Sequence, residues 1–344
     1  MIFVLPLVHT LKAAWDEEAR ALGKPLRWVA LGHRVGASLF SEAHPDYFAE
    51  CRFDESVGKL EPFGLALKWR REGRPAAVIV LGQSARLALA AWFARVPIRA
   101  GIADNRMAGL YTDSCTYRLK LRHLADRLGT LAEALRVDAP RFRQIGAREL
   151  GGLRGVEKLR RAGWDGSERL VALAPGTRGD FKRWKPERAK WPALAELMAA
   201  KGFRPVLLGT EEERGLAHAI RAAVPAAIDL TGQTSIPEAA AVLEVAGVAV
   251  AVDTGLSHLA SLVGCATVTL FGPSHERWAQ PVGPWSLSLR GDALPTAPGE
   301  LRAGDGNDSL QRLEPRRVAQ VLLALVEERS QARPQPEVVG PIDR

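Results

Sequence analysis

The stretch from Val248 to Ala260 constrains the fold of this chain more than any other part of its sequence. It reads Val-Ala-Val-Ala-Val-Asp-Thr-Gly-Leu-Ser-His-Leu-Ala, an apolar run that changes abruptly into small and polar residues. Residues 248–252 are short, apolar and β-rich, which is typical of a buried parallel strand. Apolar residues then return at helical spacing, at Leu259, Leu262 and Val263. The pattern predicts a strand, a tight turn and a helix, as in an open α/β sheet.

The polar residues of this stretch lie at the predicted strand-to-helix turn. In an open α/β sheet, ligands bind outside the carboxyl ends of the strands, and a helix start presents unpaired backbone NH groups to anions. Gly255 permits a close backbone approach, and the side chains of Thr254, Ser257 and His258 can donate hydrogen bonds. We therefore expect these residues to surround an anion such as a phosphate.

Three other interpretations of the same residues remain open. The triplet at Asp253 matches the active-site triplet of aspartic proteases, but those enzymes are all-β and need two triplets or a dimer. The run from Gly255 to Leu259 lacks the second glycine of the nucleophile elbow of serine hydrolases. The third interpretation is structural, with Asp253 as a helix N-cap and His258 as an ordinary helix residue.

Two upstream segments repeat the arrangement of a strand followed by a polar loop. Residues 170–174 predict a buried strand, and the loop after it contains Thr177 and Lys182 before a predicted helix over residues 186–200. Residues 204–209 predict the next strand, which is followed by acidic residues 211–213. A carboxylate there can accept hydrogen bonds from a ribose diol, although a charge run usually marks only a solvated helix start. Neighbouring strand ends can thus supply cations for a diphosphate and an acid for a sugar.

These motifs resemble those of the lipopolysaccharide heptosyltransferases, glycosyltransferase family 9. Residues 253–260 and 268–274 are similar to the family signature. Residues 230–238 resemble the segment that lines the nucleobase pocket of the family, and the loop ending at Trp184 resembles its lysine-bearing loop. The likeness runs from about residue 168 to 285 and continues more loosely around residues 96–102 and His123.

The resemblance implies an α/β protein of the GT-B fold, with two Rossmann-like doubly wound domains facing a cleft. Residues 1–150 would form the acceptor-binding domain, and residues 151–312 the nucleotide-sugar-binding domain, with a linker within residues 139–166. A helix over residues 313–330 is expected to cross back to the first domain. The proline-rich tail, residues 331–344, is expected to be disordered.

The resemblance also implies inverting, metal-independent transfer of a sugar, expected to be a heptose, from an ADP-sugar donor to a lipopolysaccharide core acceptor. Asp253 would orient the loop or the donor sugar. The diphosphate would be held by Thr177, Lys182, Thr254, Gly255 and His258.

The nucleoside would lie over the preceding strand ends. Glu213 is the residue that we expect to hold the ribose, with Glu211 and Glu212 as alternatives, and the backbone near Thr234 would meet the adenine. Breaking the bond between sugar and phosphate leaves negative charge on the departing diphosphate, so a site without a metal must supply cations and NH donors. Lys182 and His258 can do so, together with the predicted helix start. We expect neither a metal nor a cofactor.

The likeness to the family breaks at the beginning of the chain. In the family the first strand ends in Gly-Asp, whose aspartate is the proposed general base, and Met1–Lys12 resembles the stretch that follows. The first strand of the N-terminal domain and its aspartate are therefore expected to be missing. Losing a central strand exposes apolar surface and unpaired backbone groups, so we favour a start codon placed too late. The alternative is a catalytically inactive nucleotide-sugar-binding homologue that lacks the general base.

Charge and cysteine content narrow the partners and the compartment. Three scattered cysteines, Cys51, Cys115 and Cys265, predict a reducing cytoplasm, and no transmembrane segment is expected because no apolar run reaches about 18 residues. The net charge of +8 suits an anionic glycolipid acceptor at the inner face of the membrane, where the protein would be cytoplasmic or peripheral. Basic residues are dense in two runs, at residues 118–127 and 154–161. No nucleic acid is expected, because only Tyr117 and Trp164 lie beside these basic runs as aromatic platforms. Equally, these runs are typical of solvated helix faces.

Overall fold

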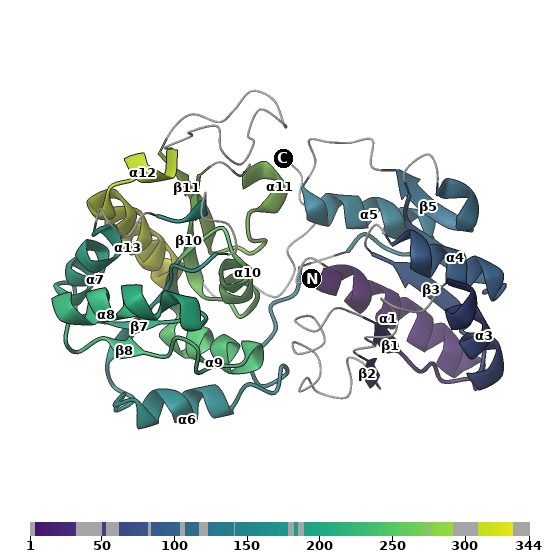
Figure 1. Ribbon diagram of the computed structural model, residues 1–344, viewed down its shortest axis with the longest axis horizontal. Helices are drawn as coiled ribbons and strands as arrows, with labels where there is room; N and C mark the ends of the chain where they lie inside the picture. The colour runs from purple at the N-terminus through teal and green to yellow at the C-terminus, as the bar shows by residue number, and fades with distance from the viewer. Residues whose placement is uncertain are drawn as a thin grey trace.

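Two α/β halves make up the protein in the computed structural model. Figure 1 shows them side by side, with strands β1 to β5 in the first half and β6 to β11 in the second. The structure describes residues 4–31, 50–52, 62–81, 84–103, 107–116, 123–140, 142–177, 182–184, 189–272, 274, 276–291 and 309–332.

The second half is built on one parallel six-stranded sheet. Its strands lie in the order β11-β10-β9-β6-β7-β8. Counted within this half, that is the 3-2-1-4-5-6 order of Rossmann folds, in which ligands bind where the order reverses. The reversal lies between β6 and β9, whose carboxyl ends therefore mark the expected binding position. The strands are β6 (Arg169–Ala174), β7 (Phe203–Leu207), β8 (Ile228–Asp229), β9 (Val248–Val252), β10 (Ala266–Phe271) and β11 (Ser286–Arg290).

Helices cover both faces of this sheet. Alternate residues of β6 enter opposite cores, with Leu170 and Ala172 packed beside α9 and α10, and Val171 and Leu173 beside α7, α8 and α13. Burial on both faces explains the uninterrupted apolar runs of the strands. The helices are α6 (Arg154–Arg161), α7 (Lys190–Ala199), α8 (Arg214–Ala223), α9 (Ile236–Ala246), α10 (Gly255–Leu262), α11 (Glu276–Ala279), α12 (Ser309–Arg312) and α13 (Pro315–Gln331), with the 3-10 turn η6 (Glu211–Glu213).

The described strands of the first half form two parallel sheets, β1-β2 and β3-β4-β5. Helix α5 packs on β5, and α4 packs on β3 and β4. The predicted absence of a first strand concerns the beginning of the chain, where Met1–Phe3 lie outside the described residues. The elements are α1 (Leu5–Ala21), β1 (Val29–Leu31), β2 (Glu50–Arg52), α3 (Pro62–Glu72), β3 (Ala77–Val80), α4 (Ala85–Phe93), β4 (Ile98–Ala103), η3 (Ala108–Leu110), β5 (Asp113–Thr116) and α5 (Leu124–Ala134).

Helix α1 and a histidine contact join the two halves. Leu5 packs in a core of the second half, whereas Leu7 and Leu11 pack in the core of the first. Figure 1 shows the amino end of α1 pointing at the second half. His123, which precedes α5, places its Nε2 at 2.9 Å from the backbone oxygen of Gln280 in the second half. The Ala125 amide donates to Nδ1 of the same ring, so the Nε2 nitrogen carries the proton and donates to Gln280.

Two predictions about the organisation of the second half differ from the structure. Part of the expected linker is the helix α6, which packs on α9 because Gly155 has no side chain to strike the Glu238 carbonyl. The expected crossing of the last helix to the first half is wrong for the described contacts. Helix α13 packs on α7 and β10 instead, burying Val318 and Leu322 in the core of the second half. Of the expected tail, residues 333–344 lie outside the described residues.

Candidate functional site

An ion pair joins the ends of β6 and β9. Asp253 directly follows β9, and its amide donates to the Leu270 carbonyl at 3.2 Å. Its carboxylate, on a side chain only 8% exposed, accepts a 2.6 Å hydrogen bond from Lys182 Nζ in the loop after β6. The structural interpretation of Asp253 as a helix cap is therefore not what is seen, because Thr254 is the N-cap residue of α10. The pair lies where the strand order reverses.

The start of α10 faces open space. Thr254 has an extended backbone, with φ −148°, and its side chain makes no cap hydrogen bond. Gly255 is exposed, and a Cβ added to it would meet no atom within 4 Å, so the start of α10 is open at this residue. Ser257 differs from the expectation, because it is fully buried and its hydroxyl donates to the Thr254 carbonyl at 2.7 Å. Ser257 therefore shapes the turn.

His258 lies in the first turn of α10, beside the ion pair. Burial lowers the pKa of His258 to about 4, and the nearby Asp253 carboxylate opposes this shift only in part. At neutral pH the imidazole is therefore uncharged. Of the two contributions considered for His258, a positive charge and an NH donor, the lowered pKa favours the neutral hydrogen-bond donor.

Glu213 lies at the adjoining ends of β6 and β7. It is 7% exposed, and its Oε2 accepts hydrogen bonds from the amide and the hydroxyl of Thr210, both at 2.7 Å. A Cβ on Gly176 would lie 2.7 Å from each oxygen of this carboxylate, and one on Gly209 would lie 3.0 Å from Oε2. The glycines therefore make room for Glu213 beside the strand ends.

The other two glutamates of the cluster are solvent-facing. Glu211 pairs with Arg214 at 2.8 Å and Glu212 with Arg183 at 3.5 Å, and the glutamate side chains are 66% and 75% exposed. Of the three candidates, only Glu213 is buried at the sheet edge.

Thr177 and Thr234 occupy the flanks of the site. Thr177 is half-buried directly after Gly176, and the loop residues 178–181 lie outside the described residues. Thr234 is half-buried in the loop between β8 and α9, where the Gly232 amide donates to the Gly209 carbonyl at 2.9 Å. The loop of Thr234 is therefore attached to the turn that leads to Glu213.

Residues far along the chain position the lysine loop, and the sequence pattern did not identify them. Gln311 in α12 donates to the Arg183 carbonyl at 2.8 Å. Lys190, only 5% exposed, donates to the carbonyls of Gln311 and Leu313 at 2.5 and 2.7 Å. These contacts join residues more than 120 positions apart, so no local pattern in the sequence could predict them.

Some groups relevant to metals, redox chemistry and membranes can be described directly. Within the described ranges, His, Cys, Asp and Glu side chains gather nowhere in groups of three or more that could hold a metal ion. Cys115 and Cys265 are free thiols, and burial raises the pKa of Cys265 to about 12. No helix in the part of the chain that the structure describes is long and apolar enough to cross a membrane.

Comparison with protein families identifies the class of protein to which this chain belongs. The model of glycosyltransferase family 9 (heptosyltransferase) matches residues 71–298, which is more than half of the chain. The chain belongs to this family, as its motifs predict.

Individual relatives agree with this assignment. Lipooligosaccharide heptosyltransferase 2 of Haemophilus ducreyi is 27% identical over 267 residues, which cover 72% of this chain and 76% of that protein. The protein of the same name from Haemophilus influenzae is 25% identical over 148 residues, 40% of this chain, and the match spans only 42% of that protein. The solved structure of Escherichia coli ADP-heptose LPS heptosyltransferase II superposes with a TM-score of 0.74 at 22% identity, covering 96% of each chain. This likeness confirms the predicted GT-B fold.

Proposed function

We propose that this chain is an inverting, metal-independent glycosyltransferase that moves a sugar, expected to be a heptose, from an ADP-sugar to a lipopolysaccharide core acceptor. The observation that carries the proposal is the Lys182–Asp253 pair beside the open start of α10, at the strand-order reversal of a Rossmann sheet. Membership of a heptosyltransferase family supports the reaction class and the donor.

The diphosphate of the donor would bind between Lys182 and the NH groups that follow Thr254. Charge accumulates on the diphosphate as the bond to the sugar breaks, and fixed donors aimed at it lower the barrier. Lys182 pairs with Asp253 at 2.6 Å, so a bound diphosphate would share this cation or draw it away. His258 would donate a hydrogen bond while neutral, and a bound dianion would raise its pKa.

The nucleoside would extend from the diphosphate toward β7 and β8. Glu213 would accept hydrogen bonds from the ribose hydroxyls, and Thr177 would contact the phosphates from the end of β6. The backbone near Thr234 would meet the adenine. The burial of Glu213 against Gly176 supports this assignment over Glu211 or Glu212.

The sugar and the acceptor would meet between the halves. Asp253 would orient the donor sugar, and the first half would bind the glycolipid acceptor at the inner face of the membrane, which would place the protein in the cytoplasm or peripheral to that membrane. The anionic acceptor agrees in sign with the net charge of +8. Inversion requires a base that removes the proton of the acceptor hydroxyl, and none of the described site residues is assigned this role.

Nucleotide binding and sugar transfer, measured separately, test the proposal. Calorimetry should rank ADP above UDP and GDP, and transfer from ADP-heptose to a lipopolysaccharide core should persist in EDTA with inversion at the anomeric carbon. Binding of ADP without transfer is the result expected of the inactive homologue. Failure of a folded protein to bind ADP would overturn the proposal.

A further inference from the structure

The outer face of α3 and α4 exposes a cluster of large apolar side chains. The exposed fractions are 59% for Phe63, 36% for Leu67, 47% for Trp92 and 38% for Phe93. We name these four residues the α3–α4 patch. Large apolar side chains that are exposed on a protein surface usually stand alone, so several together on one face indicate a contact surface.

The residues of the patch touch one another. The rings of Phe63 and Phe93 lie 6.0 Å apart, edge to face, and those of Trp92 and Phe93 lie 5.2 Å apart. Leu67 follows Phe63 by one helical turn, so both lie on the same side of α3. Arg70 Nη2 donates to the Phe93 carbonyl at 2.8 Å, which fixes α3 to the end of α4. The patch is therefore continuous across two helices.

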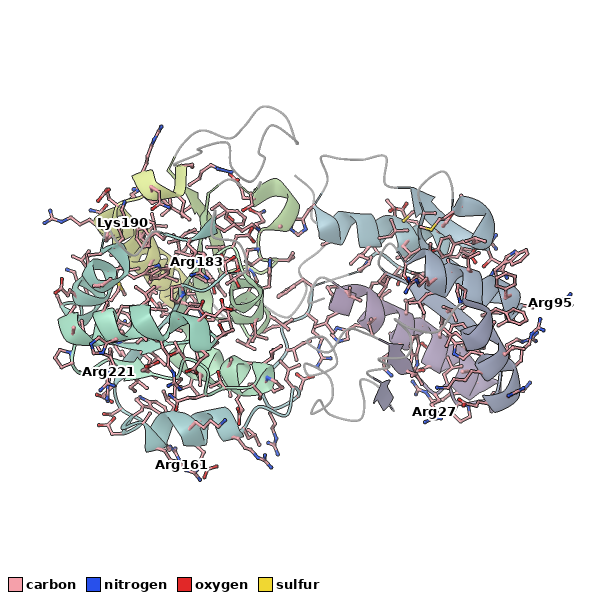
Figure 2. The ribbon with its side chains drawn as sticks, in the orientation of Figure 1. Arg27, Arg95, Arg161, Arg183, Lys190 and Arg221 are labelled. Atoms are coloured by element: carbon pink, nitrogen blue, oxygen red, sulfur yellow. The ribbon has the colours of Figure 1, made fainter. Side chains whose placement is uncertain are left out.

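Basic residues accompany the patch. Residues 62–99, which contain α3, α4 and β3, carry seven lysines and arginines and a single acidic residue, in a chain whose net charge is +8. Arg70 and Arg71 are exposed in the last turn of α3, and Arg95 is exposed just after α4. Figure 2 shows Arg95 at the outer edge of the first half, pointing away from the second half. Seven basic residues and one acidic residue give this segment a net charge of +6, so the exposed aromatic rings lie on a basic part of the first half.

We propose that the α3–α4 patch docks the protein on an anionic phospholipid surface. Tryptophan and phenylalanine enter the boundary between headgroups and acyl chains, while arginines attract anionic headgroups. A second copy of this chain is a poorer occupant, because a two-fold contact through the patch would bring two basic surfaces together. A phospholipid surface satisfies both the apolar and the charged parts.

Docking through this patch deepens the proposed function, on whose membrane-bound acceptor it rests, by naming the surface that touches the lipid, and its test requires neither donor nor acceptor. The patch belongs to the half expected to bind the glycolipid, and it lies on the side turned away from the donor-binding half (Figure 1). The second half, with Lys182 and Asp253, would therefore remain in the aqueous phase while the first half touches the lipid.

Vesicle sedimentation of the full chain tests the proposal without sugar transfer. Wild type should sediment with vesicles of equal parts phosphatidylglycerol and phosphatidylcholine, and far less with phosphatidylcholine alone. Arg95→Glu should weaken binding about fivefold for each unit of charge changed. The double variant Trp92→Ser, Phe93→Ser should weaken it about tenfold or more. Each variant is compared with wild type by circular dichroism, to establish that it is folded.

Matched controls come from the second half, where Leu153 is a 60% exposed apolar residue and Arg161 an exposed arginine of α6. Leu153→Ser and Arg161→Glu should bind vesicles as wild type does. The proposal is overturned if wild type ignores anionic vesicles, or if the patch variants bind as well as the controls. It is also overturned if wild type forms a dimer that the patch variants dissolve while vesicle binding is unchanged.

Discussion

Replacing Lys182 by alanine removes the cation that we assign to the departing diphosphate. Losing one donor that stabilises developing charge costs about 3–4 kcal/mol in favourable cases, or about a hundred- to a thousandfold in turnover. Lys182 is 27% exposed and shares its charge with Asp253, so water and the pair weaken the effect. We therefore expect Lys182→Ala to lower kcat by about ten- to a thousandfold, with a smaller rise in KM.

The same substitution should also lower stability, because it leaves the Asp253 carboxylate buried without its cation. Breaking a fully buried pair costs about 3–5 kcal/mol, and an exposed pair less than about 1 kcal/mol. With side chains 27% and 8% exposed, this pair lies between those limits, and we expect a loss of about 1–2 kcal/mol. Adding Asp253→Asn to the lysine variant should recover part of this stability but none of the turnover.

A second ion pair in the same half can separate the loss of turnover from the loss of stability. Arg204 contacts Glu168 at 2.8 Å, with side chains 20% and 35% exposed, at the amino ends of β6 and β7 and thus opposite the site. Arg204 also donates to the carbonyls of Gly163 and Ala226, so Arg204→Ala should lower the free energy of unfolding at least as much as Lys182→Ala. Because the pair lies opposite the site, kcat should stay within about twofold. Steady-state kinetics and urea unfolding of both variants give the comparison. Normal kcat in the lysine variant, or an equal loss of kcat in the arginine variant, would refute the assignment.

Three further outcomes are expected. Gly176→Ala should displace the Glu213 carboxylate and weaken ADP binding about ten- to a hundredfold, as should Glu213→Ala. Gly215→Ala, whose Cβ meets no atom within 4 Å, should leave ADP binding unchanged; calorimetry measures all three variants. His258→Ala should lower kcat about ten- to a thousandfold and His258→Asn less, since asparagine keeps a neutral NH donor; equal losses contradict the neutral-donor role. Burial lowers the pKa of His9, in α1, to about 4. Below about pH 6.5 the unfolded chain therefore binds more protons than the folded protein, and the free energy of unfolding falls as the pH is lowered toward 4. His9→Leu should remove about 2 kcal/mol of the loss measured by urea unfolding between pH 8 and pH 5.

The sheet of the second half was predictable because each strand can be recognised from its own short apolar sequence. Residues 248–252 are an apolar run ended by a glycine and an aspartate, and β9 occupies those residues. Residues 170–174 predicted β6, which begins one residue earlier. Burial on both faces forces such runs, so no knowledge of the partner strands is needed. The destination of α13 was not predictable, because an apolar stripe shows that a helix packs but not against what.

The residue types at the site were predictable from the sequence, but their pairing and their charge were less so. Lys182 and Asp253 were both expected at strand ends, but their pairing joins positions 71 residues apart and depends on the strand order. The charge of His258 depends on how deeply α10 buries it, which its sequence neighbours do not reveal. The contact of Gln311 with the lysine loop likewise depends on tertiary packing.

Glu213 illustrates how glycines at the ends of two neighbouring strands make room for one of three identical side chains. The sequence does not distinguish the three consecutive glutamates, whereas in the η6 turn that they form only Glu213 is buried. The Glu213 carboxylate lies buried against Gly176 and Gly209, whereas Glu211, which lies against Gly232, has a side chain 66% exposed. Thr210 then holds the carboxylate from below through a capping box, so its direction is fixed before any nucleotide binds. A preorganised acceptor gains affinity because little side-chain entropy is lost on binding, so we expect Glu213, buried and held by Thr210, to bind the ribose in preference to the exposed Glu211 and Glu212.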